Sequence, residues 1–224
     1  MGFLNTILEI IFPSKCLSCG KRGADLCLEC LISVPFAERE SAQWIFPIYD
    51  YRNAVIKKAL WLLKYGGKRR LASVFAEEIY AKIIEELSEM GPLQNFINPI
   101  IIPIPIASKR LKERGFNQAE LICKEIINLN HMRHGTDGKP DFTLVNNILI
   151  KPRETEHQAR IRDRGKRLKN IVGSFTVQDD TQPIKNRNII LIDDITTTGA
   201  TLSEAKKILK KSGARKVIAF TVAH

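Results

Sequence analysis

The segment that most constrains this chain runs from Asn188 to Leu202 and reads NIILIDDITTTGATL. Residues 189–192 are apolar and mostly β-branched, which predicts a strand buried on both faces. Asp193 and Asp194, here called the acid pair, end this strand. Small and mostly hydroxyl-bearing residues, here called the Thr loop, come next: Thr196, Thr197, Thr198, Gly199, Ala200 and Thr201. The amphipathic segment 202–211 follows, so the sequence predicts a strand, a loop and a helix in that order.

This arrangement favours a phosphate-binding loop. Backbone N–H groups of the Thr loop, its hydroxyls and the positive end of the following helix can converge on one phosphate. Gly199 permits the tight backbone that such an approach needs. Because two carboxylates stand beside this phosphate cradle, the sequence indicates a sugar phosphate as the ligand.

The composition of the chain limits the size of its core and the kinds of partner it can bind. With 224 residues, 44% of them hydrophobic, the chain can bury one α/β core and still carry a small accessory module. Its net charge of +11 favours polyanionic partners, but a pocket for a highly phosphorylated small molecule needs the same excess. Charge alone therefore does not choose between a nucleotide and a nucleic acid.

The N-terminal segment 2–12, GFLNTILEIIF, is apolar but too short for a membrane span, and Glu9 lies in its middle. It has neither a basic region nor a small-residue cleavage site, so we predict a packed amphipathic helix and a cytoplasmic protein.

Four cysteines follow at the spacing C-x2-C-x7-C-x2-C: Cys16, Cys19, Cys27 and Cys30. Four thiolates suit tetrahedral zinc, and the two-residue spacing lets both sulfurs of a pair reach one ion. Disulfide pairing is the alternative, which a reducing compartment disfavours. Four protein ligands leave no open position for chemistry, so we expect a structural site in a module spanning residues 1–40. The main domain is expected over 41–224.

Two basic segments interrupt the expected helices of the main domain. A strand is predicted over 44–51 and a helix over 54–65, which ends in the cation-rich turn 64–70. Another helix is predicted over 71–90, stopped by Gly91 and Pro92. The turn 64–70 is either a solvated surface or an anion-binding one.

The second basic segment, 108–118, is expected as a loop between a strand predicted over 100–106 and a helix predicted over 119–129. It lies where open α/β sheets bind ligands, which favours an anion site on the pyrophosphate side of a ligand. Its candidate residues are Ser108, Lys109, Arg110 and Arg114. A solvated helix face is the alternative. The polar stretch 131–142 is expected to be a surface connection.

Residues 151–169 hold eight cations, three acids and almost no apolar side chains. Such a segment cannot order itself by burial, so we predict a flexible lid that an anion orders. Short strands are expected on either side, over 146–150 and 171–177, and a last strand over 216–222.

Strands alternating with helices imply a largely parallel sheet with its ligand crevice outside the carboxyl ends of the strands. The basic segment, the lid and the Thr loop then meet at one end. Mg2+ suits this site because it is held by few protein carboxylates plus substrate oxygens. Acids near a ribose and cations near a departing pyrophosphate oppose the charges that develop when the C1 bond breaks. Successive strand residues point to opposite faces, so both acids reach the ribose only if the chain turns there.

These residues together resemble the ComF-type competence proteins, a branch of the type I phosphoribosyltransferases. The segment ILIDDITTTGAT resembles the phosphoribosyl-pyrophosphate motif of that superfamily, which implies the acid pair on the ribose and residues 197–201 on the 5-phosphate. The branch is indicated by the paired cysteines, the turn at Lys64, the segment after Pro105, and the lid pattern. Lid residues expected to bind ligand are Lys151, Arg153, Gln158 and Arg167. Lys151 stands where the family pattern usually has arginine, so a bidentate anion contact is lost there.

The resemblance implies an α/β fold with a type I phosphoribosyltransferase-like parallel sheet flanked by helices and a small N-terminal zinc-ribbon-like module. It also implies a role in natural transformation, in the cytoplasmic handling of incoming single-stranded DNA, with a competence helicase and DNA-processing proteins as partners. Two readings stay open: an Mg2+-dependent phosphoribosyltransferase whose acceptor the motifs do not name, and a DNA-binding adaptor without turnover. A base-salvage phosphoribosyltransferase is a third.

Overall fold

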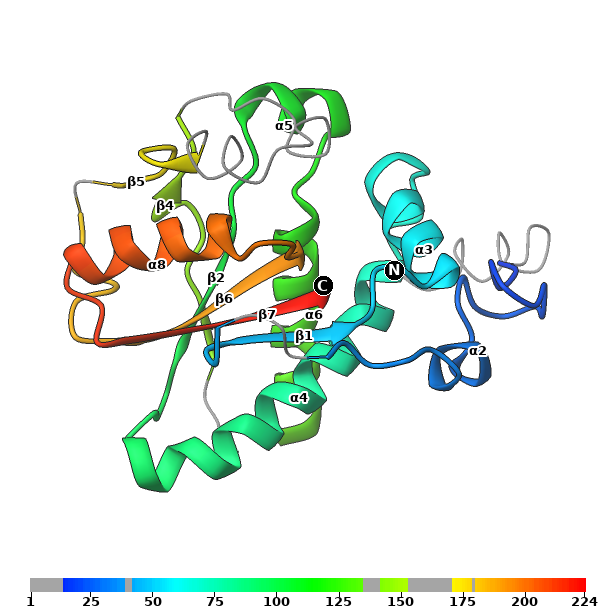
Figure 1. Cartoon of the computed structure of the whole chain (residues 1–224), viewed down its shortest axis with the longest axis horizontal. Coiled ribbons are helices and arrows are strands. Elements are labelled where there is room, and N and C mark those ends of the chain that lie inside the picture. The colour runs from blue at the N-terminus through cyan, green and yellow to red at the C-terminus, as the bar shows by residue number, and fades with distance from the viewer. Residues whose placement is uncertain (1–13, 39–41, 135–141, 153–170, 179) are drawn as a thin grey trace.

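A computed structural model describes the chain except for residues 1–13, 39–41, 135–141, 153–170 and 179. Its centre is a five-stranded sheet in the order β1-β7-β6-β2-β3, in which every pairing is parallel (Figure 1). These strands are β1 (Ile45–Tyr49), β2 (Ile100–Pro103), β3 (Thr143–Leu144), β6 (Asn188–Ile195) and β7 (Lys216–Ala223). The predicted parallel α/β sheet is confirmed.

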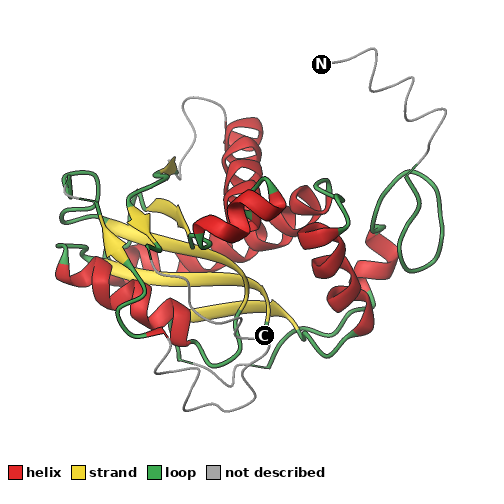
Figure 2. Cartoon of the chain, turned by 90° about the horizontal axis from the view of Figure 1, so that it is seen from above, coloured by secondary structure: helices red, strands yellow, loops and turns green. Residues whose placement is uncertain are grey.

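Helices cover both faces of this sheet, as Figures 1 and 2 show. The described helices are α2 (Leu28–Ile32), α3 (Ala54–Tyr65), α4 (Leu71–Gln94), α5 (Ser108–Arg114), α6 (Gln118–His134) and α8 (Ala200–Lys211). Alternate residues of β6 separate two apolar layers. Ile190 and Ile192 pack with α4 and α6, whereas Ile189 and Leu191 pack with α8. All four are 0% exposed, which confirms a strand buried on both faces.

Three expectations about element boundaries were wrong. Helix α4 continues through Gly91 and Pro92 and ends where Asn95 adopts a left-handed conformation, with φ 52°. Helix α6 includes residues 131–134, which were expected in a connection. The strands expected over 146–150 and 171–177 are only β4 (Leu149–Ile150) and β5 (Thr176–Val177), an antiparallel pair outside the main sheet.

The four-cysteine segment packs against the same apolar layer as α3 and α4. Cys16, Leu26 and Leu31 share one buried cluster with Leu60 and Leu63 of α3. In Figure 1, α2 lies beside α3 at one end of the molecule. The N-terminal helix expected over 2–12 and most of the expected lid lie outside the described residues. In the part of the chain that the structure covers, none of the helices is both long and apolar enough to cross a membrane.

Candidate functional site

The acid pair lies within the carboxyl end of β6 rather than beyond it. Asp193 pairs in register with Thr221 of β7, and the pairing continues to Ile195. The Oδ1 of Asp193 accepts a hydrogen bond of 2.8 Å from the N–H of Asp194. No turn separates the two carboxylates, yet both line one cavity.

The charges around the acid pair are unequal. Burial raises the pKa of Asp193 well above its usual range, and the neighbouring Asp194 carboxylate raises it further. The N–H of Asp194 and the Lys64 ammonium act in the opposite direction. The same Lys64, on α3, forms an ion pair with Asp194. One carboxylate is therefore neutralised by a cation, and the other is shifted toward its protonated form.

The Thr loop connects β6 to α8. The N–H of Thr196 binds the carbonyl of Ala223 at 2.9 Å, which ties the start of the loop to β7. Gly199 has φ 70°, and a Cβ there would lie 3.1 Å from Cδ1 of Ile45. The Thr196 hydroxyl is buried without a hydrogen-bond partner in the structure. The loop thus combines a glycine-dependent backbone, an unsatisfied hydroxyl and the amino end of α8, features that suit an anion.

The basic segment after β2 is partly helical rather than a loop. Residues 108–114 form α5, whose Arg110 and Arg114 line the cavity, while Ser108 and Lys109 are not part of the lining. Lys151 also lines it; burial lowers the pKa of Lys151, Arg110 lowers it further, and Asp193 opposes the shift. Three of the predicted anion ligands therefore meet the acid pair in one place.

The cavity has a volume of about 490 Å3 and includes the whole Thr loop in its lining. We call it the central cavity. Arg153, Gln158 and Arg167 of the expected lid lie outside the described residues. The site prediction omitted further lining residues: Tyr51, Trp61, Lys64, Tyr65, Asn117 and Gln118. Trp61, Lys64 and Tyr65 follow the i, i+3, i+4 spacing of one helix face, a signal that would have grouped them.

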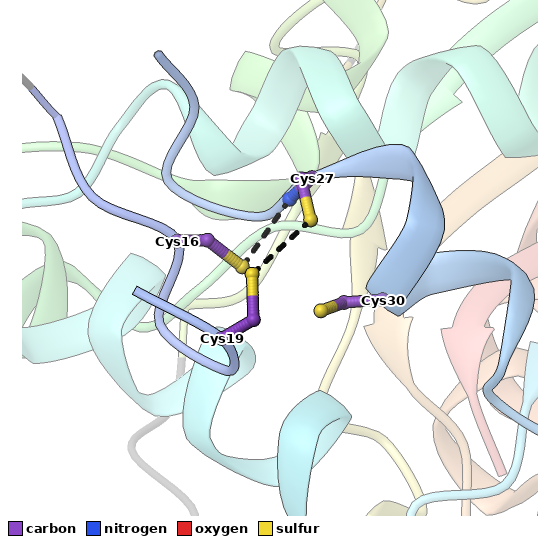
Figure 3. Close-up of side chains that lie close together, drawn as sticks. All are labelled: Cys16, Cys19, Cys27 and Cys30. Carbon is purple, nitrogen blue, oxygen red and sulfur yellow. Dashed lines mark hydrogen bonds between the residues drawn. The ribbon is translucent and has the colours of Figure 1, made fainter. Parts of the chain in front are cut away.

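The four cysteines converge on one point, as Figure 3 shows. Their Sγ atoms all lie within 4.8 Å of one another, and those of Cys19 and Cys27 are 3.6 Å apart. Zinc–sulfur bonds of about 2.3 Å in a tetrahedron place sulfurs about 3.8 Å apart, so the donor set fits zinc. Burial raises the pKa of the Cys16 thiol, but backbone N–H groups, that of Cys27 foremost, outweigh it and lower the pKa to about 6. All four thiols are free of disulfides.

Polar contacts join this four-cysteine centre to α3. The Nζ of Lys58 donates to the carbonyl of Leu17 at 2.9 Å. Lys68, in the turn after α3, forms an ion pair of 2.9 Å with the buried carboxylate of Asp25. The centre therefore supports the helix that supplies one wall of the central cavity.

The sequence is similar to that of known proteins. The phosphoribosyl transferase domain matches residues 151–224, which include the acid pair and the Thr loop. Competence protein ComFC of Bacillus subtilis (strain 168) is 28% identical over 176 residues, 78% of this chain and 62% of that protein. Competence protein F of Haemophilus influenzae is 31% identical over 119 residues, 52% of this chain and 46% of that protein. The chain is a homologue of the ComF-type competence proteins.

A third relative covers more of the chain's length. DNA utilization protein YhgH of Salmonella typhimurium is 25% identical over 207 residues, 91% of this chain and 81% of that protein. The chain spans about three-fifths of the length of the Bacillus subtilis relative. A hypoxanthine phosphoribosyltransferase structure from Staphylococcus aureus overlaps 67% of this chain and 61% of that one, with a TM-score of 0.35 and 13% identity.

Proposed function

We propose that this protein binds phosphoribosyl pyrophosphate with Mg2+ in the central cavity and acts in the cytoplasm on incoming single-stranded DNA during natural transformation. The observation that carries the proposal is the meeting of three groups in one cavity. These are the acid pair, the Thr loop, and the cations Arg110, Arg114 and Lys151. Its relatives are named competence and DNA utilization proteins, which supports the DNA role.

Each group of residues would bind a different part of phosphoribosyl pyrophosphate. The Thr loop would receive the 5-phosphate, and the unsatisfied Thr196 hydroxyl gives it one donor without a competing partner. The acid pair would accept hydrogen bonds from the ribose hydroxyls. Arg110 and Lys151 would stabilise the negative charge of a departing pyrophosphate. Carboxylate oxygens are common ligands of Mg2+, and a bound Mg2+ would neutralise the pyrophosphate oxygens. Lys64 must release Asp194 when these ligands bind.

Titration calorimetry with phosphoribosyl pyrophosphate and Mg2+ tests the proposal. We expect binding by the wild type and its collapse when Asp193→Asn is combined with Asp194→Asn. The combination of Glu85→Gln and Glu89→Gln makes the same kind of change, two carboxyl groups to amides, at exposed residues of α4 and should leave binding intact. Absence of wild-type binding at millimolar ligand contradicts the proposal.

A DNA-binding adaptor without turnover is the second candidate. Four cations, Lys64, Arg110, Arg114 and Lys151, line the central cavity, and the guanidinium of Arg69 lies 4.6 Å from the ring centroid of Phe116. Affinity for a single-stranded oligonucleotide should then fall steeply with salt, with a log–log slope of roughly −0.7 for each phosphate contact. Negligible affinity at low salt would rule the adaptor out. Base salvage draws no support from the competence and DNA utilization names of the relatives.

A further inference from the structure

Helix α5, which brings Arg110 to the central cavity, is not held by the apolar core. The structure describes all seven of its residues, 108–114, and none of them is buried. Leu111, its large apolar side chain, is 44% exposed. In Figure 1 this helix lies at the outer edge of the molecule. Since a helix normally keeps its place through a packed apolar face, other contacts must hold α5 beside the cavity.

The two ends of α5 are fixed. Ala107 before it is buried, and the side-chain amide of Asn117 donates a hydrogen bond of 3.0 Å to the carbonyl of Ile104. Gly115, with φ 76°, ends the helix, and its N–H binds the carbonyl of Leu111. Two fixed ends define an axis, so the angle of α5 about that axis depends on contacts made from its side.

Two arginine–aromatic contacts with the turn after α3 provide support from the side. Arg114 of α5 lies 4.8 Å from the ring centroid of Tyr65 and donates a hydrogen bond of 2.8 Å to its hydroxyl. In the reverse sense, Arg69 of the turn lies 4.6 Å from the ring centroid of Phe116. A Cβ built on Gly115 would stand 3.9 Å from the Nη2 of Arg69, so this guanidinium lies close to two successive residues. We call these two contacts the clasp.

The turn after α3 is a well-supported partner for the clasp. The N–H of Arg69 binds the carbonyl of Gly67, and the N–H of Ala72 in α4 binds the carbonyl of Arg69, both at 2.9 Å. Lys68 forms its ion pair of 2.9 Å with Asp25, close to the four-cysteine centre. The clasp therefore connects α5, which has no buried residue, to a turn that is fixed by its own hydrogen bonds and by an ion pair.

We propose that Arg69 and Phe116 are positioning residues that hold Arg110 of α5 on the pyrophosphate side of the central cavity. Neither of the two is among the described residues that line this cavity, so each acts through α5. The inference rests on the proposed function, because it names the residues that orient one of the anion contacts of that site.

The cations of the cavity need such support because they repel one another. Burial lowers the pKa of Lys151, and the charge of Arg110 lowers it further, so the two like charges act on each other. Without a ligand, this repulsion favours a movement of α5 away from the cavity. A clasp that keeps Arg110 in place reduces the ordering cost that a pyrophosphate meets when it binds.

Calorimetry with two ligands separates positioning from a general loss of structure. Phosphoribosyl pyrophosphate contains the group that Arg110 would bind, whereas ribose 5-phosphate lacks it. Arg69→Gln and Phe116→Leu should each weaken phosphoribosyl pyrophosphate binding about two- to fivefold, as expected for one exposed cation–π contact, and leave ribose 5-phosphate binding unchanged. The double variant should bind no more weakly than either single variant, because both substitutions remove the same contact.

Two further variants are the controls. Phe116→Tyr keeps the ring and should bind both ligands like the wild type. Arg133→Gln removes a contact of the same kind between α6 and α4, in which Arg133 lies 5.2 Å from the ring centroid of Tyr80, and it should leave both affinities unchanged. Unchanged phosphoribosyl pyrophosphate affinity in Arg69→Gln and Phe116→Leu, or equal weakening of both ligands, overturns the proposal.

Amide exchange tests the clasp without any ligand. Exchange in residues 108–114 should be faster in Arg69→Gln and Phe116→Leu than in the wild type, and unchanged in Arg133→Gln. Equal exchange in all four proteins overturns the positioning role. Faster exchange in the two clasp variants, together with a wild type that binds no phosphoribosyl pyrophosphate, would support the clasp and count against the proposed function, so the two failures are distinguishable.

Discussion

The raised pKa of Asp193 should make the stability of the folded chain depend on pH. Burial and the Asp194 charge raise this pKa in the folded protein, whereas an unfolded aspartate titrates near about 3.9. Protonated Asp193 therefore contributes fully to the free energy of unfolding at a pH below the pKa of the unfolded chain. This contribution is lost as the pH rises through the higher pKa of the folded chain. Asp193→Asn stays neutral, so its free energy of unfolding should escape this loss, which amounts to about 1.4 kcal/mol for every pH unit that separates the folded pKa from the unfolded one.

Urea unfolding between pH 4 and pH 9 measures this difference. The wild-type free energy of unfolding should fall relative to that of Asp193→Asn as pH rises. Asp180→Asn changes an exposed carboxylate that accepts a hydrogen bond from the N–H of Gln182, and its curve should follow the wild type. Parallel curves for Asp193→Asn and wild type would mean that Asp193 is ionised as easily in the folded chain as in the unfolded one.

Individual site residues differed in how far the sequence revealed them. Asp193, Asp194 and the Thr loop follow one another, so a local pattern of strand, acids and small residues was enough to group them. Lys64 was recognised only as part of a basic turn, since its partner Asp194 belongs to a distant strand. Gln118 was recognised only as part of the segment after Pro105, because an unsatisfied amide is a property of burial and not of residue type.

At the scale of the element, the strand-to-helix connection depends on one glycine. Gly199 precedes α8 with φ 70°, a conformation that costs other residues about 1–2 kcal/mol, and an added Cβ would press on Ile45. Gly199→Ala should therefore lower stability by about that amount and also weaken phosphoribosyl pyrophosphate binding severalfold. Thermal unfolding and calorimetry measure the two effects.

The opposite end of α8 provides the control. Gly213 also has a positive φ, 96°, and an added Cβ would meet Lys185 only at an ordinary 3.5 Å. Gly213→Ala should thus lose stability through the backbone alone and retain ligand binding. If both alanine variants bound ligand equally well, the Thr loop would not depend on the geometry of Gly199.

Whole elements were more predictable than their ends. The apolar runs predicted strands β2, β6 and β7, because burial on both faces of a strand leaves an uninterrupted hydrophobic pattern. The end of α4 was missed because Pro92 removes one donor without preventing the last turn, and the left-handed Asn95 sets the boundary instead. Segment 108–114 was expected in a loop, and its helix buries no residue from which periodicity could be read.

At the scale of the whole molecule, the four-cysteine centre should carry one zinc ion that stabilises the chain. Replacing Cys27→Ser and Cys30→Ser together removes half of a donor set whose Sγ atoms lie within 4.8 Å. We expect elemental analysis to find about one zinc in wild type and none in this variant. A loss of about 3 kcal/mol would lower the unfolding midpoint by roughly 6–12 °C in a chain of this size.

Cys123 offers the matched control for the zinc measurement. It is a buried thiol of α6 outside the cluster, so Cys123→Ala should keep the metal. Because Lys58 and Lys68 connect the centre to α3, metal loss should also increase amide exchange in α3. If amide exchange in α3 did not change after the metal was lost, the four-cysteine centre would not stabilise the α3 wall of the cavity.

Transformation of a naturally competent host that lacks the gene tests the biological role. The paired variant Asp193→Asn with Asp194→Asn and the paired variant Glu85→Gln with Glu89→Gln each replace two carboxyl side chains by amides, the first pair in the central cavity and the second on the exposed surface of α4. If the sugar-phosphate site is needed for uptake, only the α4 variant should restore transformation at equal protein level. Full restoration by the acid-pair variant would instead support an adaptor that works through its cations.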